Sequence, residues 1–337
     1  MPNRYTVEQR DGLYLLRDQE KRAQARVMPS KGNNVVQFQV TPEGALAPID
    51  VFIPPEGEDG LGEYGYRAGN PILFPFPNRV KNGHYAFNGR EYQFDINEKA
   101  RGNHIHGLVS SRPWEVQDSG ASAEGGAWLT ASISPVSYPE NERQYPFPCT
   151  LTVTNRLQEG LLVQEITVRN TGEGPLPMGY GTHPWFHATL AGAKREAAEV
   201  KVPGNQYWEL ENLVPTGRTI PVTREPGKFD LREWHALNGN EYDDVFTDLV
   251  RRADGWSEAG IRYRNVGLEL VVEASPEFRE WVIYAPADRP VVCLEPYTCT
   301  TNAVNLQRQG IDAGLIVLQT GESWSGVIRT LLRPATE

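Results

Sequence analysis

The chain has 337 residues, of which 39% are hydrophobic and 23% charged, a composition that is typical of a globular protein and excludes a disordered chain. The formal net charge of -10 has the wrong sign for a protein that neutralises phosphates, so we expect no nucleic-acid partner. No apolar run approaches the roughly 18 residues of a membrane span, and charged residues interrupt the N-terminal segment, so we expect a cytoplasmic protein that does not bind membranes.

Strand signals follow one another along the chain, with Gly, Pro, Asn or Asp between them. The 32 glycines and 26 prolines indicate many turns and few long helices. The predicted strand regions are 34–40, 84–96, 127–136, 147–170, 267–274, 277–286, 289–296 and 313–332.

Two hairpins are predicted among these strands. Asn88-Gly89 lies between alternating segments and suits a type I′ turn, because both residues accept positive φ angles. Gln158-Glu159-Gly160 lies between two longer alternating segments and predicts a three-residue turn with a bulge.

Helical periodicity is weak and is best at 7–25 and 193–200. Strands never alternate regularly with helices of 10 to 15 residues, which disfavours a doubly wound α/β fold. We therefore expect an all-β protein, a large antiparallel β-sandwich with minor short helices. Residues 1–29 are expected to be an N-terminal extension packed on a single domain of residues 30–337.

Histidines gather in two segments, NHIHG at 103–107 and GTHPWFH at 181–187. If residues 104–106 form a strand, His104 and His106 point to one face and can chelate a metal. The carboxylate that such a site needs a few residues later is missing, because Ser110 and Ser111 stand there. We therefore expect no bound metal.

Three other residues are candidates for a polar site. Arg79 follows Asn78 at the end of a stiff, proline-rich segment, where its guanidinium can bind paired oxygens; a structural ion pair is the alternative. Glu295 ends a buried strand, where a carboxylate can have a raised pKa and act as a base. Asp243 lies in EYDDVFTDL beside a second aspartate.

The order of these motifs resembles the aldose 1-epimerase (galactose mutarotase) family, from about residue 30 to the C-terminus. Each motif is short and unspecific, but five occur in the family's order. They are Asn78-Arg79, Asn103 to Gly107, Gly181 to Phe186, Asp243 to Phe246, and Glu295 with Asn302 to Asn305.

The resemblance implies a galactose mutarotase-like β-supersandwich that interconverts the α and β anomers of an aldose without a metal or organic cofactor. By the same resemblance, Glu295 is the general base, His183 the general acid and His106 a second site histidine. The remaining residues expected to contact the sugar are Arg79, Asp243, Asn78, His104 and Trp185. Candidate aromatic walls for the apolar face of the sugar ring are Trp185, Phe186, Phe76 and Tyr297.

Some residues depart from the family's pattern and leave the substrate open. Leu108 replaces a glycine, and Pro184 to His187 replace a Ser-Tyr-Phe-Asn segment. Tyr145 to Pro148 look more like a branch of bacterial epimerase-like proteins and hexose-6-phosphate 1-epimerases, which makes this chain a divergent, bacterial-type member. A phosphorylated hexose would need another cation, for which Lys99 and Arg101 are the candidates.

Three functions remain open from the sequence. The first is a hexose mutarotase, the second a hexose-6-phosphate 1-epimerase of the same fold, and the third a non-catalytic carbohydrate-binding protein. In each the partner is a small sugar, and the chain is a monomer or a homodimer.

Overall fold

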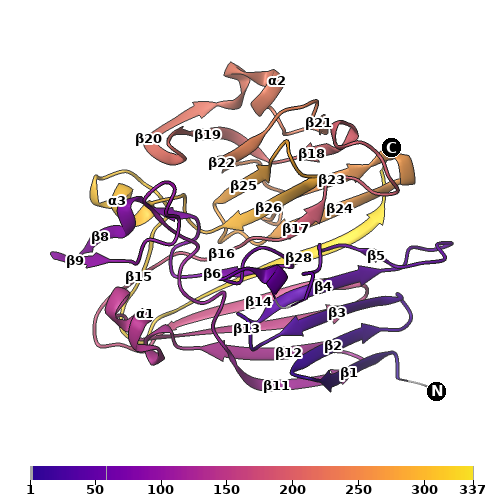
Figure 1. Ribbon diagram of the computed structural model, residues 1–337, viewed down its shortest axis with the longest axis horizontal. Helices are drawn as coiled ribbons and strands as arrows, with labels where there is room; N and C mark the ends of the chain where they lie inside the picture. The colour runs from indigo at the N-terminus through magenta and orange to yellow at the C-terminus, as the bar shows by residue number, and fades with distance from the viewer. Residues whose placement is uncertain (1–2, 58, 337) are drawn as a thin grey trace.

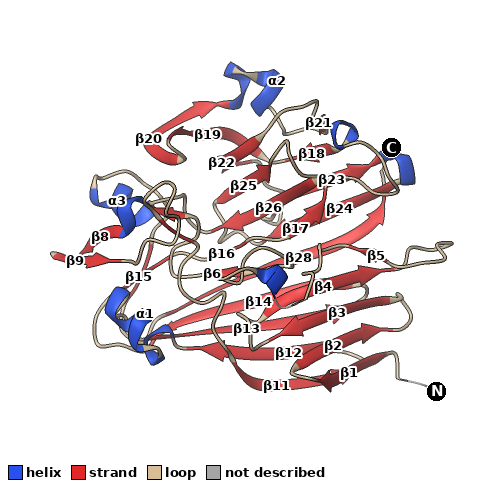
Figure 2. Ribbon diagram, in the orientation of Figure 1, coloured by secondary structure: helices blue, strands red, loops and turns tan. Residues whose placement is uncertain are grey.

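The computed structural model describes residues 3–57 and 59–336, and strands make up most of its regular structure (Figure 2). This confirms the all-β prediction. In the described ranges the helical segments are short. They are α1 (Pro139–Gln144), α2 (Pro226–Phe229), α3 (Ala303–Arg308) and the 3₁₀ turns Asp59–Leu61, Lys81–Gly83, Pro135–Ser137, Arg195–Ala197, Val222–Arg224 and Arg264–Val266.

One layer of the fold is a nine-stranded antiparallel sheet. Its strands, in spatial order, are β11 (Glu115–Ser122), β12 (Gly126–Ile133), β13 (Cys149–Gln158), β14 (Leu161–Asn170), β28 (Ser323–Pro334), β24 (Leu268–Ala274), β23 (Ser257–Tyr263), β18 (Glu199–Lys201) and β21 (His235–Ala236). Burial alternates residue by residue along β13, because one face of this strand covers the core and the other faces water.

Two smaller sheets face this layer (Figure 1). The first contains β1 (Tyr5–Arg10), β2 (Leu13–Asp18), β3 (Ala23–Met28), β4 (Asn34–Val40) and β5 (Ile49–Asp50). The second contains β20 (Val214–Pro221), β19 (Gly204–Glu211), β22 (Tyr242–Leu249), β25 (Glu280–Ala285), β26 (Val291–Tyr297), β16 (Gly181–Thr182) and β6 (Ile72–Leu73), with β17 (Trp185–His187) paired to β26.

The two smaller sheets join into one continuous surface. The amide of Ile53 donates to the carbonyl of Trp185 at 2.8 Å, and Phe52 forms a bridge with Phe186. The aromatic rings of these phenylalanines lie 5.5 Å apart in the core between the layers. Burial of large apolar side chains on both inner faces stabilises the sandwich, at roughly 1.5 to 3 kcal/mol for each fully buried side chain.

Three two-stranded ribbons complete the strand list. They are β7 (Arg79–Val80) with β10 (His104–Ile105), β8 (His84–Phe87) with β9 (Arg90–Gln93), and β15 (Leu176–Met178) with β27 (Ile316–Leu318). The first ribbon matters most for function, because it brings two of the predicted polar motifs together.

Both hairpins are present, but one has a shorter turn than predicted. Asn88 and Gly89 have φ values of 49° and 74°, as a type I′ turn requires. In the second hairpin Gln158 pairs directly with Leu161, so the turn contains only Glu159 and Gly160. The three-residue turn with a bulge was wrong, because Glu159 itself adopts a positive φ of 51°.

The helical prediction for residues 7–25 was also wrong. Asp11 and Gly12 both have positive φ, at 51° and 76°, and turn the chain into the β1–β2 hairpin. An Asp-Gly pair favours this turn and was the sequence signal against a helix. In the region 193–200, helical structure is limited to the single turn Arg195–Ala197.

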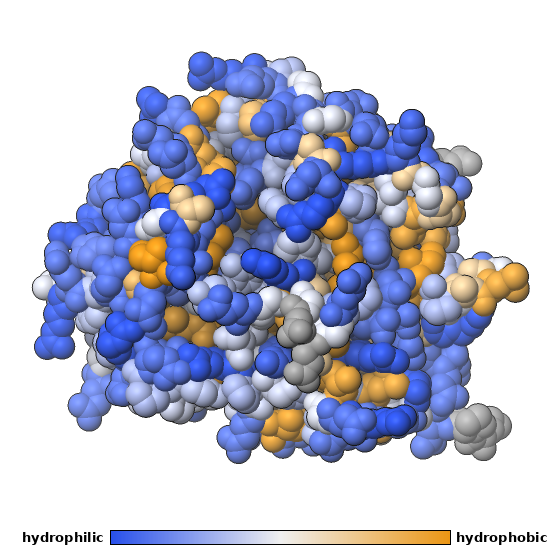
Figure 3. Space-filling model, viewed as in Figure 1, coloured by the Kyte–Doolittle hydropathy of each residue, from blue (hydrophilic) through white to orange (hydrophobic). Residues whose placement is uncertain are grey.

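In the described residues, no helix is long and apolar enough to cross a membrane. The face shown in Figure 3 carries mostly hydrophilic side chains, with hydrophobic ones scattered between them. Large exposed hydrophobic residues are few among the described residues and lie apart in the sequence: Leu46, Val250, Val266 and Val317. Scattered apolar residues of this kind are normal on a protein surface and do not form a docking patch.

Candidate active site

A row of side chains crosses four strands on the outer face of the second smaller sheet. Asp243 on β22 pairs with Tyr284 on β25, Tyr284 pairs with Cys293 on β26, and Cys293 pairs with Trp185 on β17. Paired residues of neighbouring strands project from the same face, and so do residues two apart in one strand. Glu295 therefore lies on this face, two residues after Cys293.

This face and the neighbouring loops enclose a polar cleft of about 410 Å³. The cleft is lined by Tyr66, Arg67, Asn78, Arg79, Ile105, His106, His183, Trp185, Asp243, Tyr284, Arg289 and Glu295. A volume of this size is in the range of small-molecule sites. Seven of the eight residues predicted for the site line it.

Arg79 is held in the cleft wall by three polar neighbours. Its Nε and Nη2 atoms donate to the Glu98 carboxylate at 3.1 Å, and Nη2 also donates to Oδ2 of Asp243 at 3.3 Å. The Asn78 side chain accepts from Nη1 at 3.2 Å. The arginine is thus fixed in position, with its charge balanced by two carboxylates.

His106 enters the cleft because the chain turns sharply directly after β10. Its φ is 67° and that of Gly107 is 70°. A Cβ on Gly107 would lie 2.1 Å from the carbonyl oxygen of Phe74, so only glycine fits there. The His106 amide donates to the carbonyl of Asn78 at 2.9 Å, which joins the two motifs of this ribbon.

His104, in contrast, does not line the cleft. Its ring stacks on Phe94 with centroids 4.5 Å apart, and its two nitrogens contact the carbonyls of Asp95 and Gly107 at 2.8 and 3.1 Å. The expectation that His104 and His106 share one face was wrong, because the positive φ of His106 ends the strand and its period-two alternation.

His183 and Glu295 meet at the bottom of the cleft. Nδ1 of His183 lies 3.6 Å from Oε1 of Glu295, and this nitrogen has no hydrogen-bond partner among the described residues. The hydroxyl of Tyr297 donates to Oε2 of Glu295 at 2.5 Å. The His183 ring also stacks on Trp185, with centroids 5.0 Å apart and planes 2° from parallel.

Burial controls the protonation of this pair, because it disfavours the charged form of each group. It raises the pKa of Glu295 well above its usual value, although the hydrogen bond from Tyr297 opposes the rise. It lowers the pKa of His183 to about 3, and the positive charges of Arg79 and Arg289 act in the same direction. At neutral pH, burial thus favours a protonated carboxyl beside a neutral imidazole.

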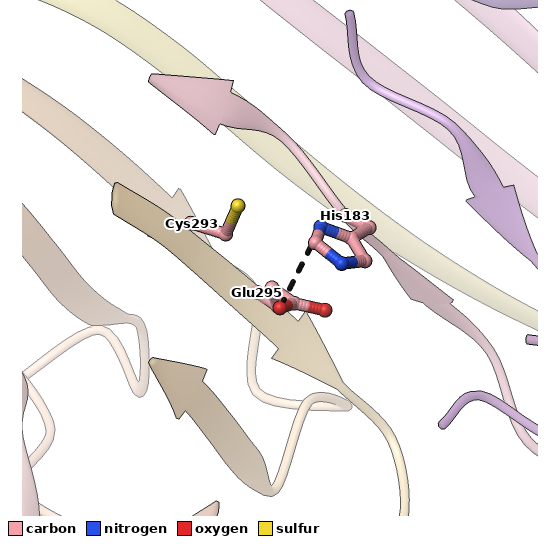
Figure 4. Close-up of side chains that lie close together, drawn as sticks. All are labelled: His183, Cys293 and Glu295. Atoms are coloured by element: carbon pink, nitrogen blue, oxygen red, sulfur yellow. Dashed lines mark ion pairs between the residues drawn. The ribbon is translucent and has the colours of Figure 1, made fainter. Parts of the chain in front are cut away.

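Among the described residues, His183, Glu295 and Cys293 form the group that could hold a metal ion (Figure 4). Their potential ligand atoms lie within 4.8 Å of one another, and all three side chains are buried. Cys293 is fully buried and is not part of the cleft lining. Burial raises the pKa of this thiol well above its usual value, which disfavours the thiolate that binds zinc.

Several aromatic residues that the sequence suggested as walls of the site lie elsewhere. Phe76 packs with Tyr85 and Tyr145 in an aromatic cluster of the core, and Phe186 packs against Phe52 between the layers. Tyr297 lies behind Glu295 rather than at the cleft surface. Trp185 is thus the one residue of the suggested aromatic walls that lines the cleft.

The two cations suggested for a phosphate also lie outside the cleft lining. Lys99 and Arg101 are absent from it, and Arg101 contacts Glu98 at 3.4 Å. Two other arginines, Arg67 and Arg289, take part in the lining and were missed, together with Tyr66 and Tyr284. They come from loops and a strand without a distinctive motif, and only the register of the sheets brings them together.

The comparisons with known proteins agree with this architecture. A sequence model of the Aldose 1-epimerase family matches residues 39–330. An uncharacterised Escherichia coli protein, YihR, is 29% identical over 256 residues, 74% of this chain and 75% of that one. Human galactose mutarotase is 28% identical over 158 residues, 46% of this chain and 43% of that one.

Solved structures show the same fold. A galactose mutarotase-like protein from Clostridium acetobutylicum superposes with a TM-score of 0.85 at 23% identity, covering 98% of both chains. A putative aldose 1-epimerase from Escherichia coli gives a TM-score of 0.71 at 20% identity, covering 98% of this chain and 99% of that one. The galactose mutarotase-like sandwich is thereby confirmed, and the chain belongs to the aldose 1-epimerase family.

Proposed function

We propose that this protein is an aldose 1-epimerase that interconverts the α and β anomers of a hexose. The observation that carries the proposal is the contact of His183 with Glu295, 3.6 Å apart in a polar cleft. Opening a pyranose requires removal of a proton from the C1 hydroxyl and delivery of a proton to the ring oxygen O5. A carboxylate and an imidazole side by side supply one acceptor and one donor.

In the proposed cycle, Glu295 accepts the proton of the C1 hydroxyl and His183 donates one to O5. The C1–O5 bond breaks, and C1 becomes an aldehyde carbon while O5 becomes the hydroxyl of C5. Rotation about the C1–C2 bond then turns the other face of the aldehyde toward this hydroxyl. On reclosure His183 takes the proton back from that hydroxyl, and Glu295 returns its proton to the oxygen on C1. No atom is gained or lost, and both side chains end as they began.

The burial of the pair suits the middle of this cycle. After ring opening, Glu295 is a neutral acid and His183 a neutral imidazole, the forms that burial favours. The open-chain state is therefore stabilised by the environment of the pair. Tyr297 opposes the rise of the Glu295 pKa, which keeps the ionised carboxylate accessible for the first step.

Other residues of the cleft fit the remaining tasks of sugar binding. Arg79 and His106 can donate to O5 and to ring hydroxyls, while Asp243 and Asn78 can accept from hydroxyls. The ring of Trp185 offers a flat wall to the apolar face of a pyranose. Holding the sugar in one orientation beside the proton-transfer pair contributes to the rate by itself.

Polarimetry tests the proposal directly. Fresh α-D-glucose, α-D-galactose and the α anomer of glucose 6-phosphate are followed to equilibrium in buffer, with wild-type protein and with Glu295→Ala. The proposal predicts that wild type accelerates the change for at least one sugar and that the variant does not. If every sugar relaxes at the buffer rate with wild-type protein while calorimetry detects sugar binding, the protein is a carbohydrate-binding protein instead.

A further inference from the structure

Two guanidinium groups in the cleft, those of Arg67 and Arg289, have no task in the proton transfers described above. We propose that they form an anion subsite, so that the preferred substrate is a hexose carrying an acidic group, a phosphate or a carboxylate, at a position remote from C1. This inference rests on the proposed function and names the substrate class of the same cleft.

Arg289 lies in the loop between β25 and β26 and is oriented by aromatic rings. Its guanidinium carbon is 5.6 Å from the centroid of Trp185 and 6.0 Å from that of Tyr284, and Nη2 donates to the Tyr284 hydroxyl at 2.7 Å. The nearest carboxylate, that of the adjacent Asp288, is 3.7 Å from Nε, beyond hydrogen-bond distance. The group is thus positioned by stacking and leaves N–H donors available.

Arg67 enters the cleft from the loop before β6. Among the described residues, its side chain makes no ion pair with a carboxylate. Its stem passes over Gly62, where an added Cβ would lie 2.7 Å from the Cδ atom of Arg67. The glycine therefore leaves space for the stem, while the charged end reaches the cleft lining.

Trp185 connects the two arginines with the proton-transfer pair. Its Nε1 donates to the carbonyl of Tyr66 at 2.8 Å, directly before Arg67, while Arg289 lies over its ring and His183 stacks on it. An anion between the arginines would therefore lie beside the sugar ring and not on the reacting carbon.

The charge balance of the cleft points to an anionic ligand. The charge of Arg79 is already met by Glu98 and Asp243, whereas among the described residues no carboxylate of the cleft lining forms an ion pair with Arg67 or Arg289. Two guanidinium groups that line one cleft repel each other, and a neutral sugar does not offset this repulsion. An acidic group removes this repulsion and gains charge-assisted hydrogen bonds, even though the chain has a net charge of -10.

Anion binding would also act on His183. The charge of Arg289 helps to lower the pKa of this histidine, and an anion bound to Arg289 would offset that effect. His183 would then gain the proton that it donates to O5 more easily. An acidic hexose should accordingly be turned over faster than its neutral counterpart as well as bound more tightly.

The test compares anomer exchange of glucose, glucose 6-phosphate and glucuronate by NMR exchange spectroscopy, for wild type, Arg289→Gln and Arg67→Gln. We expect kcat/KM for at least one acidic sugar to exceed that for glucose, and the ratio to fall about 10- to 100-fold in each variant, as the loss of a charge-assisted contact implies. Glucose 6-phosphate and glucuronate distinguish a phosphate from a carboxylate. The exposed Arg10, in the other sheet, gives the matched control Arg10→Gln, which should keep the wild-type ratio.

Failure of the subsite and failure of the proposed function give different results. If wild type exchanges glucose at least as well as both acidic sugars and the ratios do not change in the variants, the anion subsite is wrong and the epimerase proposal stands. If no sugar exchanges, calorimetry with glucose 6-phosphate and glucuronate decides. Binding that weakens in Arg289→Gln supports the subsite alone, and binding that is absent or unaffected overturns it.

Discussion

Nδ1 of His183 faces Oε1 of Glu295 at 3.6 Å, and the nitrogen has no other hydrogen-bond partner among the described residues. The two residues come from different strand regions, β26 and the link between β16 and β17. A buried polar atom without a partner destabilises a fold by roughly 1 to 3 kcal/mol. A sugar hydroxyl or ring oxygen that binds between the two groups would remove this cost.

The first prediction concerns the coupling of this pair. Glu295→Gln and His183→Gln should each lower kcat by about 10² to 10⁴-fold, because each removes one proton-transfer group. The double variant should be little slower than either single variant, because neither proton-transfer group can work without the other. Polarimetry measures the rates. Additive losses would contradict a paired role, and Glu124→Gln, an exposed change far from the cleft, is the control.

Tyr297 gives a second prediction, as a positioning residue for Glu295. Tyr297→Phe removes the hydroxyl that donates to Oε2, so the pKa of Glu295 should rise further and kcat should fall about tenfold, with little change in KM. In the pH profile of kcat/KM, the decline at high pH that reports the ionisation of Glu295 should move to higher pH. Tyr145→Phe is the matched control, because it removes a buried hydroxyl that donates to the carbonyl of Pro177 in the core. If both variants change the pH profile alike, Tyr297 is merely structural.

The pH dependence of the reaction is the third prediction. The pair of Glu295 and His183 is active while it shares one proton. This proton is lost above the raised pKa of Glu295. A second proton binds only as the pH falls toward about 3, the lowered pKa of His183. The profile of kcat/KM should therefore be flat from about pH 5 up through neutral pH, and it should fall only above the raised pKa of Glu295. Initial rates across this range measure it. A limb with its midpoint near 6.5, the value of an unperturbed histidine, would show that burial does not control the pair.

Glu280 supports a fourth prediction, on stability. It is buried on β25, where Trp208 and Thr247 donate to its carboxyl oxygens at 3.0 and 3.1 Å, and burial raises its pKa to about 8. Between about pH 4.5 and 8 the unfolded chain releases this proton while the folded chain keeps it. Rising pH should thus destabilise the fold by up to about 1.4 kcal/mol per unit through this group, with no contribution below that window.

Glu280→Gln should remove this contribution. The neutral amide keeps an acceptor oxygen, so the melting temperature of the variant should fall less steeply from pH 5 to 8 than that of wild type. Thermal unfolding at several pH values measures the two slopes. Parallel slopes would mean that Glu280 is ionised in the folded protein, and Glu124→Gln again serves as the control.

Metal removal is the fifth prediction. Dialysis of the purified protein against a chelator should leave the rate of anomer exchange unchanged, because the proposed proton transfers use only side chains. The thiol of Cys293, which is protonated at neutral pH because burial raises its pKa, makes the His183, Cys293 and Glu295 group a poor zinc site. Loss of activity that added zinc restores would contradict this prediction.

The sequence predicted those parts of the fold and the site that depend on local pattern. The alternation of apolar and polar residues predicted most strands. The short motifs predicted His183, Glu295 and Arg79 as site residues, and these line one cleft. His104 was misplaced because the positive φ of His106 breaks the alternation. The sequence does not show which residues of distant strands pair.

For the same reason, Arg289 was not predicted. Its position depends on the contact of the β25–β26 loop with Trp185 on another strand. Tyr297 was suggested as a wall of the site, whereas it does not line the cleft and its hydroxyl donates to Glu295. The Asp11-Gly12 pair indicates a hairpin turn, but the apparent helical periodicity of residues 7–25 favoured a helix there.

The most direct test of the central claim is NMR exchange spectroscopy of α and β anomers at equilibrium, over a panel of neutral and acidic hexoses. Wild-type protein should accelerate exchange for at least one sugar, and Glu295→Gln, with its fold verified by circular dichroism, should not. Exchange at the buffer rate for every sugar with wild type, or undiminished catalysis by the Glu295→Gln protein, would contradict it.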